Sequence, residues 1–329
     1  MPEEVVTRIE NENVLIQIGD CTVTILPQFG GKISSILVRG HELLQAPLAP
    51  YAPRTRIMSF DEGDASGWDE CLPSVARCTA QTVNGPVDVP DHGDLWRVAW
   101  QVLTSANGSI SMQGDCFSLP LKLLRTITLT QTEKGYRLQA DYQVTNTSAT
   151  ETPWAWSAHA GYASEAGDRV ILPDSIKTLR LEGSGGGRLG KGGDTVAWPV
   201  AKLVTGGETN LSIATPPESN TGDKLFAGPL AAAENWCALE RPKAGVRLRI
   251  RFDPALTPYL GVWICNGGWP DRPGTKQHCV ALEPATAPVD SLGLTGPWSR
   301  TLAAGESFTW PMTVDLEFLY VTAAEMNCR

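Results

Sequence analysis

Apolar and polar residues alternate along much of the chain, and this alternation predicts β-strands. Residues 13–19 (NVLIQIG) and 21–26 (CTVTIL) are short runs rich in Val, Ile and Thr, with a turn between them. In residues 246–252 (VRLRIRF) every second residue is apolar. A period of two is what a half-buried antiparallel sheet requires, because successive side chains point to opposite faces.

Longer segments extend the same pattern, and helical patterns are few. Residues 123–146 predict two strands around an EKG turn at 133–135, and residues 95–103 (LWRVAWQVL) predict another strand. Residues 231–236 (AAAENW) are long enough for one helical turn. The glycine-rich residues 183–193 (GSGGGRLGKGG) lack the spacing of a phosphate-binding loop, so we expect a mobile surface loop there.

The predicted strands extend almost from one end of the chain to the other, without a low-complexity linker or a repeat of fixed period. The 32 glycines and 24 prolines indicate many turns. A length of 329 residues would suggest two domains at ~150 residues each, but large all-β folds often exceed ~200 residues as one domain. We therefore expect an all-β protein, with residues 1–329 forming a single large antiparallel β-sandwich.

Charge and cysteine usage exclude several classes of partner. The chain has 27 basic and 36 acidic residues and a net charge of −9, which argues against nucleic acid and against an anionic membrane surface. It has no run of 18 apolar residues and no basic region leading into an apolar stretch at its start. Its eight cysteines form no C-x-x-C pair. We expect reduced, mostly buried thiols in a cytoplasmic protein that needs no metal or cofactor.

Two of the four histidines have neighbours that favour a functional role. His92 lies in VPDHGDLW before a predicted strand, where the adjacent glycine permits close approach of a ligand or of backbone. His159 lies in PWAWSAHAGYA, where small residues leave room for a ligand and Trp154 and Trp156 could wall a pocket. His41 is expected to be exposed in a turn, and His278 to have a structural role.

The carboxylates supply the other half of the candidate chemistry. Glu283 ends the apolar run CVALE before a proline-containing loop, so it is placed to project into a cleft. Asp69 and Glu70 lie in an apolar context, and a buried carboxylate needs a partner. Arg54 or Arg56 is the candidate partner.

Six segments, taken in order, resemble the aldose 1-epimerase (galactose mutarotase-like) superfamily. They are GWDECLPS (67–74), PDHGDLW (90–96), WSAHAGY (156–162), GDKLFAG (222–228), LGVWICNGGWP (260–270) and ALEPATAPVDSL (281–292). The resemblance implies a large antiparallel β-sandwich of the supersandwich type, with a sugar bound on its concave face.

The resemblance also implies roles for individual residues. Glu283 matches the general base and His159 the general acid, while His92 matches a second histidine near the ring oxygen. The expected substrate-binding residues, with His92, are Arg56 (or Arg54), Asp223, Asp69 and Trp263. In the implied reaction, the base takes the proton of the anomeric hydroxyl and the acid protonates the ring oxygen. The ring opens, the aldehyde turns and the ring closes on its other face, without metal or cofactor.

The sequence leaves alternatives open. The first is a carbohydrate-binding protein on the same scaffold without catalysis. The second is a glycoside hydrolase that pairs Glu283 with Asp69 or Glu70. The third is a hexose 6-phosphate epimerase, in which the phosphate would be bound by arginines drawn from Arg54, Arg56, Arg77 and Arg97. The identity of the sugar and the oligomeric state are also left open.

Overall fold

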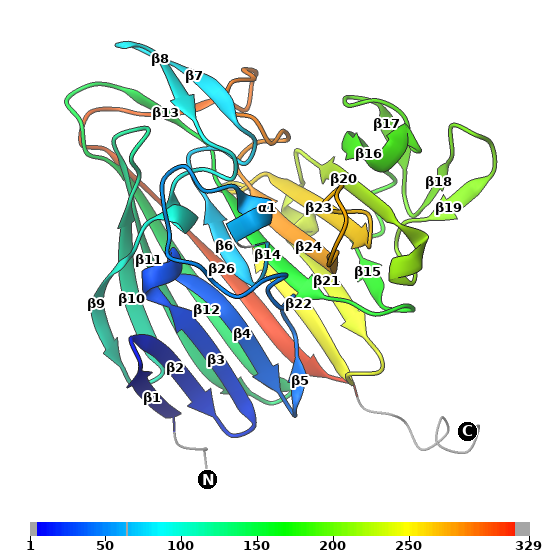
Figure 1. Cartoon of the computed structure of the whole chain (residues 1–329), viewed down its shortest axis with the longest axis horizontal. Helices are drawn as coiled ribbons and strands as arrows, with labels where there is room; N and C mark the ends of the chain where they lie inside the picture. The colour runs from blue at the N-terminus through cyan, green and yellow to red at the C-terminus, as the bar shows by residue number, and fades with distance from the viewer. Residues whose placement is uncertain (1–4, 64, 320–329) are drawn as a thin grey trace.

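The computed structural model describes residues 5–63 and 65–319 and shows two large antiparallel sheets packed face to face (Figure 1). In this part of the chain, 12 strands form the larger sheet. In spatial order they are β1 (Val5–Glu10), β2 (Asn13–Ile18), β3 (Cys21–Leu26), β4 (Lys32–Val38), β6 (Trp68–Cys71), β14 (Ser157–Ala163), β24 (His278–Ala285), β23 (Tyr259–Asn266), β20 (Thr221–Ala227), β16 (Thr178–Ser184) and β17 (Thr195–Ala197), with β5 (His41–Glu42) beside β4.

The second large sheet has eight strands within the described residues. In spatial order they are β15 (Arg169–Ile171), β21 (Trp236–Arg241), β22 (Val246–Phe252), β26 (Ser307–Phe318), β12 (Gly135–Asn146), β11 (Leu121–Thr132), β10 (Ser109–Asp115) and β9 (Gln101–Ala106). Small hairpins and ribbons flank the sheets: β7 (Cys78–Thr82) with β8 (Gly85–Val89), β13 (Thr152–Trp154) with β25 (Arg300–Leu302), and β18 (Val200–Lys202) with β19 (Glu208–Asn210). Helical turns are α1 (Phe60–Gly63) and the 3-10 turns η1 (Pro27–Phe29), η2 (Leu95–Arg97), η3 (Gly185–Gly187), η4 (Pro217–Ser219) and η5 (Ala232–Glu234).

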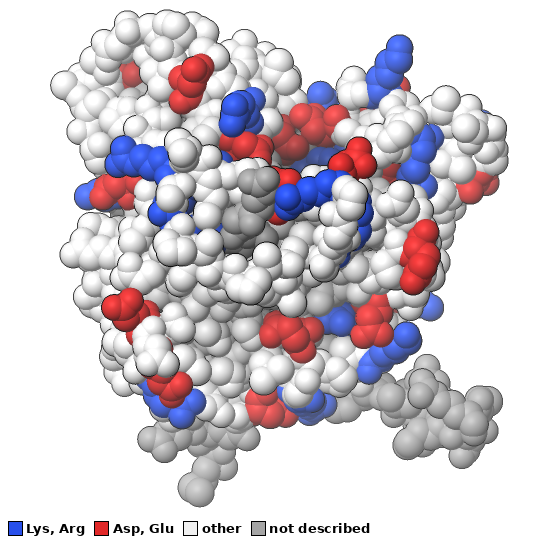
Figure 2. All heavy atoms as spheres, in the orientation of Figure 1, with Lys and Arg blue, Asp and Glu red and all other residues white. Residues whose placement is uncertain are grey.

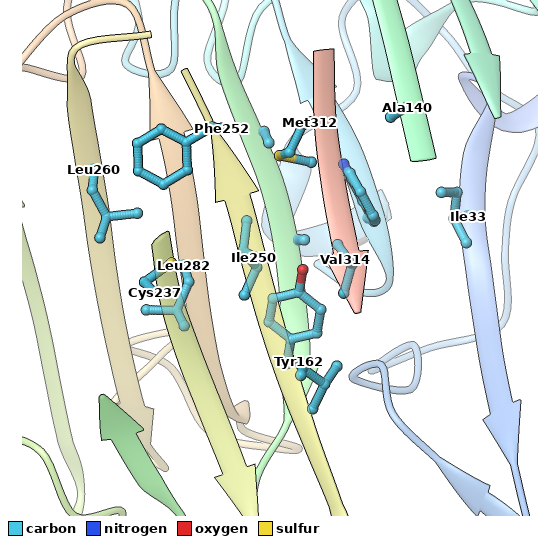
Figure 3. Packing of buried hydrophobic residues seen from close by; sticks show 14 of the residues in the cluster. Ile33, Ala140, Tyr162, Cys237, Ile250, Phe252, Leu260, Leu282, Met312 and Val314 are labelled. Atoms are coloured by element: carbon cyan, nitrogen blue, oxygen red, sulfur yellow. The ribbon is translucent and has the colours of Figure 1, made fainter. Parts of the chain in front are cut away.

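The core lies between the two sheets because each sheet presents one apolar face to the other. Leu282 on β24 and Val262 on β23 are directly opposite each other and fully buried. They belong to the same cluster of buried residues as Ile250 on β22 and Val314 on β26. Figure 3 shows this packing from close by. The predicted all-β sandwich is confirmed.

A buried polar network crosses this core. The carboxylate of Glu70 on β6 accepts hydrogen bonds from Arg125 Nη1 on β11 at 2.8 Å, from Tyr142 Oη on β12 at 3.0 Å and from Trp156 Nε1 at 2.8 Å. Both charged side chains are fully buried. The partner of Glu70 is therefore Arg125, and the predicted pairing with Arg54 or Arg56 is wrong.

Most local predictions from the alternation pattern are confirmed, and one strand is not. The runs at 13–19, 21–26 and 246–252 form β2, β3 and β22, and the long hairpin forms β11 and β12. Residues 95–103 begin instead as η2, and the strand β9 starts only at Gln101. The cause is tertiary: Trp96 and Trp100 are both buried, and the segment is held by distant residues, with Trp100 N–H donating to Pro27 O at 2.8 Å and Arg97 Nε to Met58 O at 3.1 Å.

The remaining predictions on single segments have mixed outcomes. His41 is exposed, as expected, and residues 232–234 form one 3-10 turn. Of the seven cysteines described, five are buried, and Cys328 lies outside the described residues. Across residues 5–63 and 65–319, no helix has the length and apolar character to cross a membrane.

Candidate active site

A cavity of about 220 Å³ opens on the outer face of the 12-stranded sheet, opposite the core. It is lined by four of the predicted residues, which are up to 191 positions apart in the chain: Glu283, His159, His92 and Trp263. Its other lining residues are Phe60, Val75, Ala76, Asp91, Lys224, Trp269, Gln277 and Asp290. Figure 2 shows acidic side chains gathered in the hollow between the β7–β8 hairpin and the part of the chain that holds β16 to β19. The volume lies below the ~300–1,000 Å³ of drug-sized sites, so the cavity suits a small ligand.

The register of the central strands explains why these residues meet. Ser157 pairs with Ala285 and Gly161 with Ala281, so His159 on β14 lies opposite Glu283 on β24. Neighbouring residues in such a row point to the same face of the sheet. The alternate residues point into the core, as Ala158 and Leu282 do. The alternation of side chains along these strands therefore places one set of residues in the core and the other set at the cavity.

Glu283 is fully buried, and its two carboxylate oxygens have different surroundings. Oε2 accepts hydrogen bonds from Lys224 Nζ and, at 3.3 Å, from Ser157 Oγ. Oε1 has no hydrogen-bond partner among the described residues. A buried carboxylate oxygen without a partner is costly unless a ligand completes its hydrogen bonds. Oε1 is therefore the atom available to a bound molecule.

Gly261 on β23 provides the space for this arrangement. It pairs directly with Glu283 across the strands. A Cβ atom at this position would lie 3.0 Å from Glu283 Oε2 and 3.3 Å from Lys224 Nζ. Any larger residue would therefore press on the Glu283–Lys224 pair.

The two cavity histidines pack against each other and against Phe60. The His92 and His159 rings are perpendicular with centroids 5.0 Å apart, and Phe60 stacks on His92 at 3.8 Å. Burial, together with the charges of His92, Lys224 and Lys32, holds the pKa of His159 well below its usual value. His159 is therefore neutral at pH 7 in the free protein.

His92 is oriented by its neighbour Asp91. Its Nδ1 lies 2.8 Å from Asp91 Oδ2. Burial alone would raise the pKa of Asp91, but the hydrogen bond and the charges of His92, Arg97 and Arg77 outweigh it and lower that pKa. Gly93, the residue after His92, has φ +66°, and a Cβ atom at this position would lie 2.3 Å from Leu72 O. The predicted close approach at this glycine is thus an approach of backbone, and it fixes the turn that presents His92.

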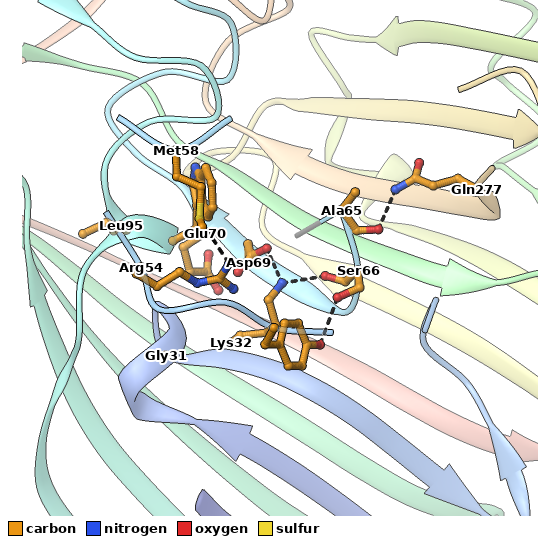
Figure 4. Close-up of polar contacts among 12 residues, drawn as sticks. Gly31, Lys32, Arg54, Met58, Ala65, Ser66, Asp69, Glu70, Leu95 and Gln277 are labelled. Atoms are coloured by element: carbon orange, nitrogen blue, oxygen red, sulfur yellow. Dashed lines mark hydrogen bonds and ion pairs between the residues drawn. The ribbon is translucent and has the colours of Figure 1, made fainter. Parts of the chain in front are cut away.

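The aromatic walls of the cavity are not the ones predicted. Trp154 and Trp156 are buried in the core, and Trp156 Nε1 bonds Glu70 there. Trp263, Trp269 and Phe60 line the cavity instead. Trp263 Nε1 donates to Gln277 Oε1 at 3.3 Å, and Gln277 Nε2 donates to Ala65 O at 2.8 Å (Figure 4). Trp263 thus lines the cavity, and its role in binding substrate stays a prediction.

Asp69 and Arg56 are not among the residues that line the cavity. Asp69 is buried in the same row as His159 and pairs with Lys32, whose Nζ also donates to Ser66 O at 2.6 Å (Figure 4). Arg56 is exposed, with its guanidinium 4.9 Å from the centre of the Phe117 ring. The alternative arginine, Arg54, lies over the Trp96 ring at 5.2 Å and does not line the cavity either.

Asp223 lies on the other face of β20 from the cavity. It pairs with Ile264, a core residue, whereas the next residue, Lys224, pairs with Trp263 on the cavity side. The buried Asp223 carboxylate accepts hydrogen bonds from Ser184 Oγ at 2.7 Å and from Arg188. Arg188 comes from the glycine-rich segment that was expected to be a mobile loop. The structure therefore uses this segment to neutralise Asp223, away from the cavity.

Two cavity residues, Lys224 and Asp290, were missed by the sequence analysis. Both lie in segments that carry the resemblance, GDKLFAG and ALEPATAPVDSL. The signal that could have found Lys224 is its position one residue after Asp223, since alternation places one of the two on each face. His278 has the structural contact expected of it, with Nε2 3.0 Å from Thr215 O. Within the described part of the chain, no group of three or more His, Cys, Asp or Glu side chains is arranged to hold a metal ion.

Comparison with solved structures identifies the fold. A proposed aldose 1-epimerase from Klebsiella pneumoniae is similar with a TM-score of 0.69 and 15% identity, covering 98% of this chain and 85% of that one. A galactose mutarotase-like protein from Lactobacillus casei has a TM-score of 0.62 and 16% identity, covering 95% and 100%. The chain has the galactose mutarotase-like fold.

Other comparisons agree with this fold assignment. An aldose epimerase homologue from C. elegans is similar with a TM-score of 0.59 and 14% identity, covering 91% of this chain and 96% of that one. No protein-family model matches the chain, and no curated protein matches it by sequence. The galactose mutarotase-like fold thus rests on structure, and the activity has to be argued from the cavity itself.

Proposed function

We propose that this protein is an aldose 1-epimerase, which interconverts the α and β anomers of a free sugar. The observation that carries the proposal is Glu283, which lines the cavity and whose buried Oε1 has no hydrogen-bond partner among the described residues. It shares the cavity with two imidazoles and with an indole face that can stack on a sugar ring. Ring opening needs one group to take a proton and one to give a proton, and these residue types supply both.

In this proposal Glu283 is the general base and His159 the general acid. Glu283 takes the proton of the anomeric hydroxyl while His159 protonates the ring oxygen, and the roles reverse when the ring closes. To protonate the ring oxygen and end as a neutral imidazole, His159 must act in its imidazolium form. Because its pKa is lowered, this requirement predicts that turnover declines as pH rises toward neutrality. His92, oriented by Asp91, would hydrogen-bond near the ring oxygen.

Several observations count against two of the three alternatives. The predicted glycoside hydrolase would pair Glu283 with Asp69 or Glu70, but Glu70 points into the core and Asp69 pairs with Lys32, so neither of these two lines the cavity. For a sugar phosphate, none of Arg54, Arg56, Arg77 and Arg97 lines the cavity. Arg97 is buried and donates to the backbone carbonyls of Met58 and Asp91. Lys224, the lysine at the cavity, is already paired with two carboxylates.

The test is the polarimetric mutarotation of freshly dissolved α-D-glucose and α-D-galactose. The wild type should accelerate it, and Glu283→Gln should lower kcat by ~10²–10⁴-fold because the amide cannot accept the proton. His159→Ala should lose most of the rate. Glu208→Gln, at an exposed position on β19, is the matched control and should keep the wild-type rate.

The outcomes separate the assignments. A Glu283→Gln variant with near-wild-type turnover would remove Glu283 as the base. A larger loss in His92→Ala than in His159→Ala would move the acid role to His92. Absence of acceleration by the wild type, with binding of a sugar in a calorimetric screen, would support the carbohydrate-binding alternative instead.

A further inference from the structure

Three charged side chains meet at one end of the cavity. Lys224 Nζ donates to Glu283 Oε2, and it forms a second ion pair with Asp290 Oδ1 at 3.6 Å. The three residues come from β20, from β24 and from the loop that follows β24, and all of them line the cavity. Lys224 therefore links the candidate base to a second carboxylate.

Asp290 is held in place by its own backbone. Its carbonyl oxygen accepts hydrogen bonds from the N–H groups of Val75 and Ala76 at 2.9 and 2.8 Å, and from Ser74 Oγ at 3.1 Å. Its own N–H donates to Glu182 Oε1 at 3.3 Å. The position of its carboxylate is thus set by the loop and not by Lys224 alone.

The balance of charge in this group bears on the basicity of Glu283. A single ammonium beside a carboxylate stabilises its anion and makes it a weaker base. Here two carboxylates share one ammonium, so the group carries one excess negative charge when all three are ionised. Burial, with the charges of Glu283 and Glu182, raises the pKa of Asp290 to about 6 despite the opposing effect of Lys224. Burial would lower the pKa of Lys224, but Asp290 and Glu283 together raise it.

We propose that Lys224 and Asp290 are positioning residues that act on the epimerase reaction through Glu283. Lys224 holds Oε2, so Oε1 is the oxygen that faces the sugar. Asp290 shares the ammonium of Lys224, so the charge of Lys224 is not balanced by Glu283 alone. This inference rests on the proposed function for its catalytic consequence, but the charge coupling itself can be measured without turnover.

Other titratable and charged groups also surround Glu283 and stay in place in the variants below. They are His159 on β14, Cys71 and Asp69 on β6, Lys32 on β4, Cys279 on β24 itself, and His92 with Asp91 in the loop before η2. Because these groups are unchanged, a difference between variants reports on Lys224 and Asp290.

The experiment compares Lys224→Met with Asp290→Asn, because the proposal predicts shifts of opposite sign. Lys224→Met removes the ammonium and leaves Asp290 close by, so Glu283 should titrate ~1–3 pH units higher and the acidic limb of the kcat profile should move up with it. Asp290→Asn leaves Lys224 to interact with Glu283 alone, so the Glu283 titration and the acidic limb of the kcat profile should both move to lower pH. Lys224→Arg keeps the charge and should restore most of the wild-type profile.

Two readouts are needed, so that this inference and the proposed function can fail separately. The first is the pH profile of kcat for sugar mutarotation. The second is ¹³C NMR titration of the glutamate carboxyl carbons in the intact protein, with the Glu283 signal assigned by its loss in Glu283→Gln. If the wild type shows no turnover, the proposed function fails, while the titration still tests the coupling.

Particular outcomes would overturn the inference. Shifts of the same sign in Lys224→Met and Asp290→Asn, or an unchanged Glu283 titration in both, would show that the two residues do not control Glu283. Circular dichroism of each variant identifies loss of folding, and if Lys224→Met does not fold, the downward shift predicted for Asp290→Asn carries the test. Lys243→Met, which removes an exposed lysine paired with Glu165, is the control and should leave both readouts unchanged.

Discussion

The buried pair of Glu70 and Arg125 gives the sharpest prediction about stability. Each side chain has 0% exposure, and the pair joins the two sheets across the core. Taking two charges out of water is costly, and their attraction offsets this cost only while both are present. Removing one partner leaves an uncompensated buried charge. We therefore expect Glu70→Gln to lower the free energy of unfolding by about 3–5 kcal/mol.

The double variant Glu70→Gln/Arg125→Met should behave differently. It leaves no buried charge, and the amide of Gln can still meet Tyr142 Oη and Trp156 Nε1, which now bond Glu70. The double variant should therefore be no less stable than Glu70→Gln alone, which corresponds to a large coupling between the two sites.

Urea unfolding measures both effects, with midpoints compared at equal slope. The control is Glu10→Gln, which breaks the exposed Arg8–Glu10 pair, whose atoms are 3.4 Å apart, and should cost at most about 1 kcal/mol. Additive losses in the double variant, or a loss in Glu70→Gln no larger than in the control, would refute the reasoning.

Two further predictions concern the cavity. Gly261→Ala should lower kcat by about tenfold or more with little loss of stability, because its Cβ would lie 3.0 Å from Glu283 Oε2 and displace it. Gly183→Ala on β16, where a Cβ meets no atom within 4 Å, is the matched control, and equal rates in both variants would contradict the steric argument. Trp263→Ala should raise KM by about tenfold, or about 1.4 kcal/mol, by removing a stacking face for the sugar. A raised KM in steady-state polarimetry checks this, and an unchanged KM would place the sugar elsewhere.

The sequence by itself determined the local structure and the residue types of the site. Alternation is a local property, so β2, β3, β22 and the β11–β12 hairpin could be predicted without knowing their partners. The resemblance of short ordered segments led to the galactose mutarotase-like fold. Glu283, His159, His92 and Trp263, predicted one by one, do meet in one cavity.

Only the tertiary structure decided which strands align and therefore which charges pair. Arg125 is 55 residues from Glu70, and Lys32 is 37 residues from Asp69, and no local pattern joins either pair. Which of Asp223 and Lys224 faces the cavity depends on the register of β20 against β23, where a slip of one residue would exchange them. The physical reason is that alternation along a strand determines which residues share a face. Only pairing with distant strands determines which of the two faces is turned toward the cavity and which toward the core.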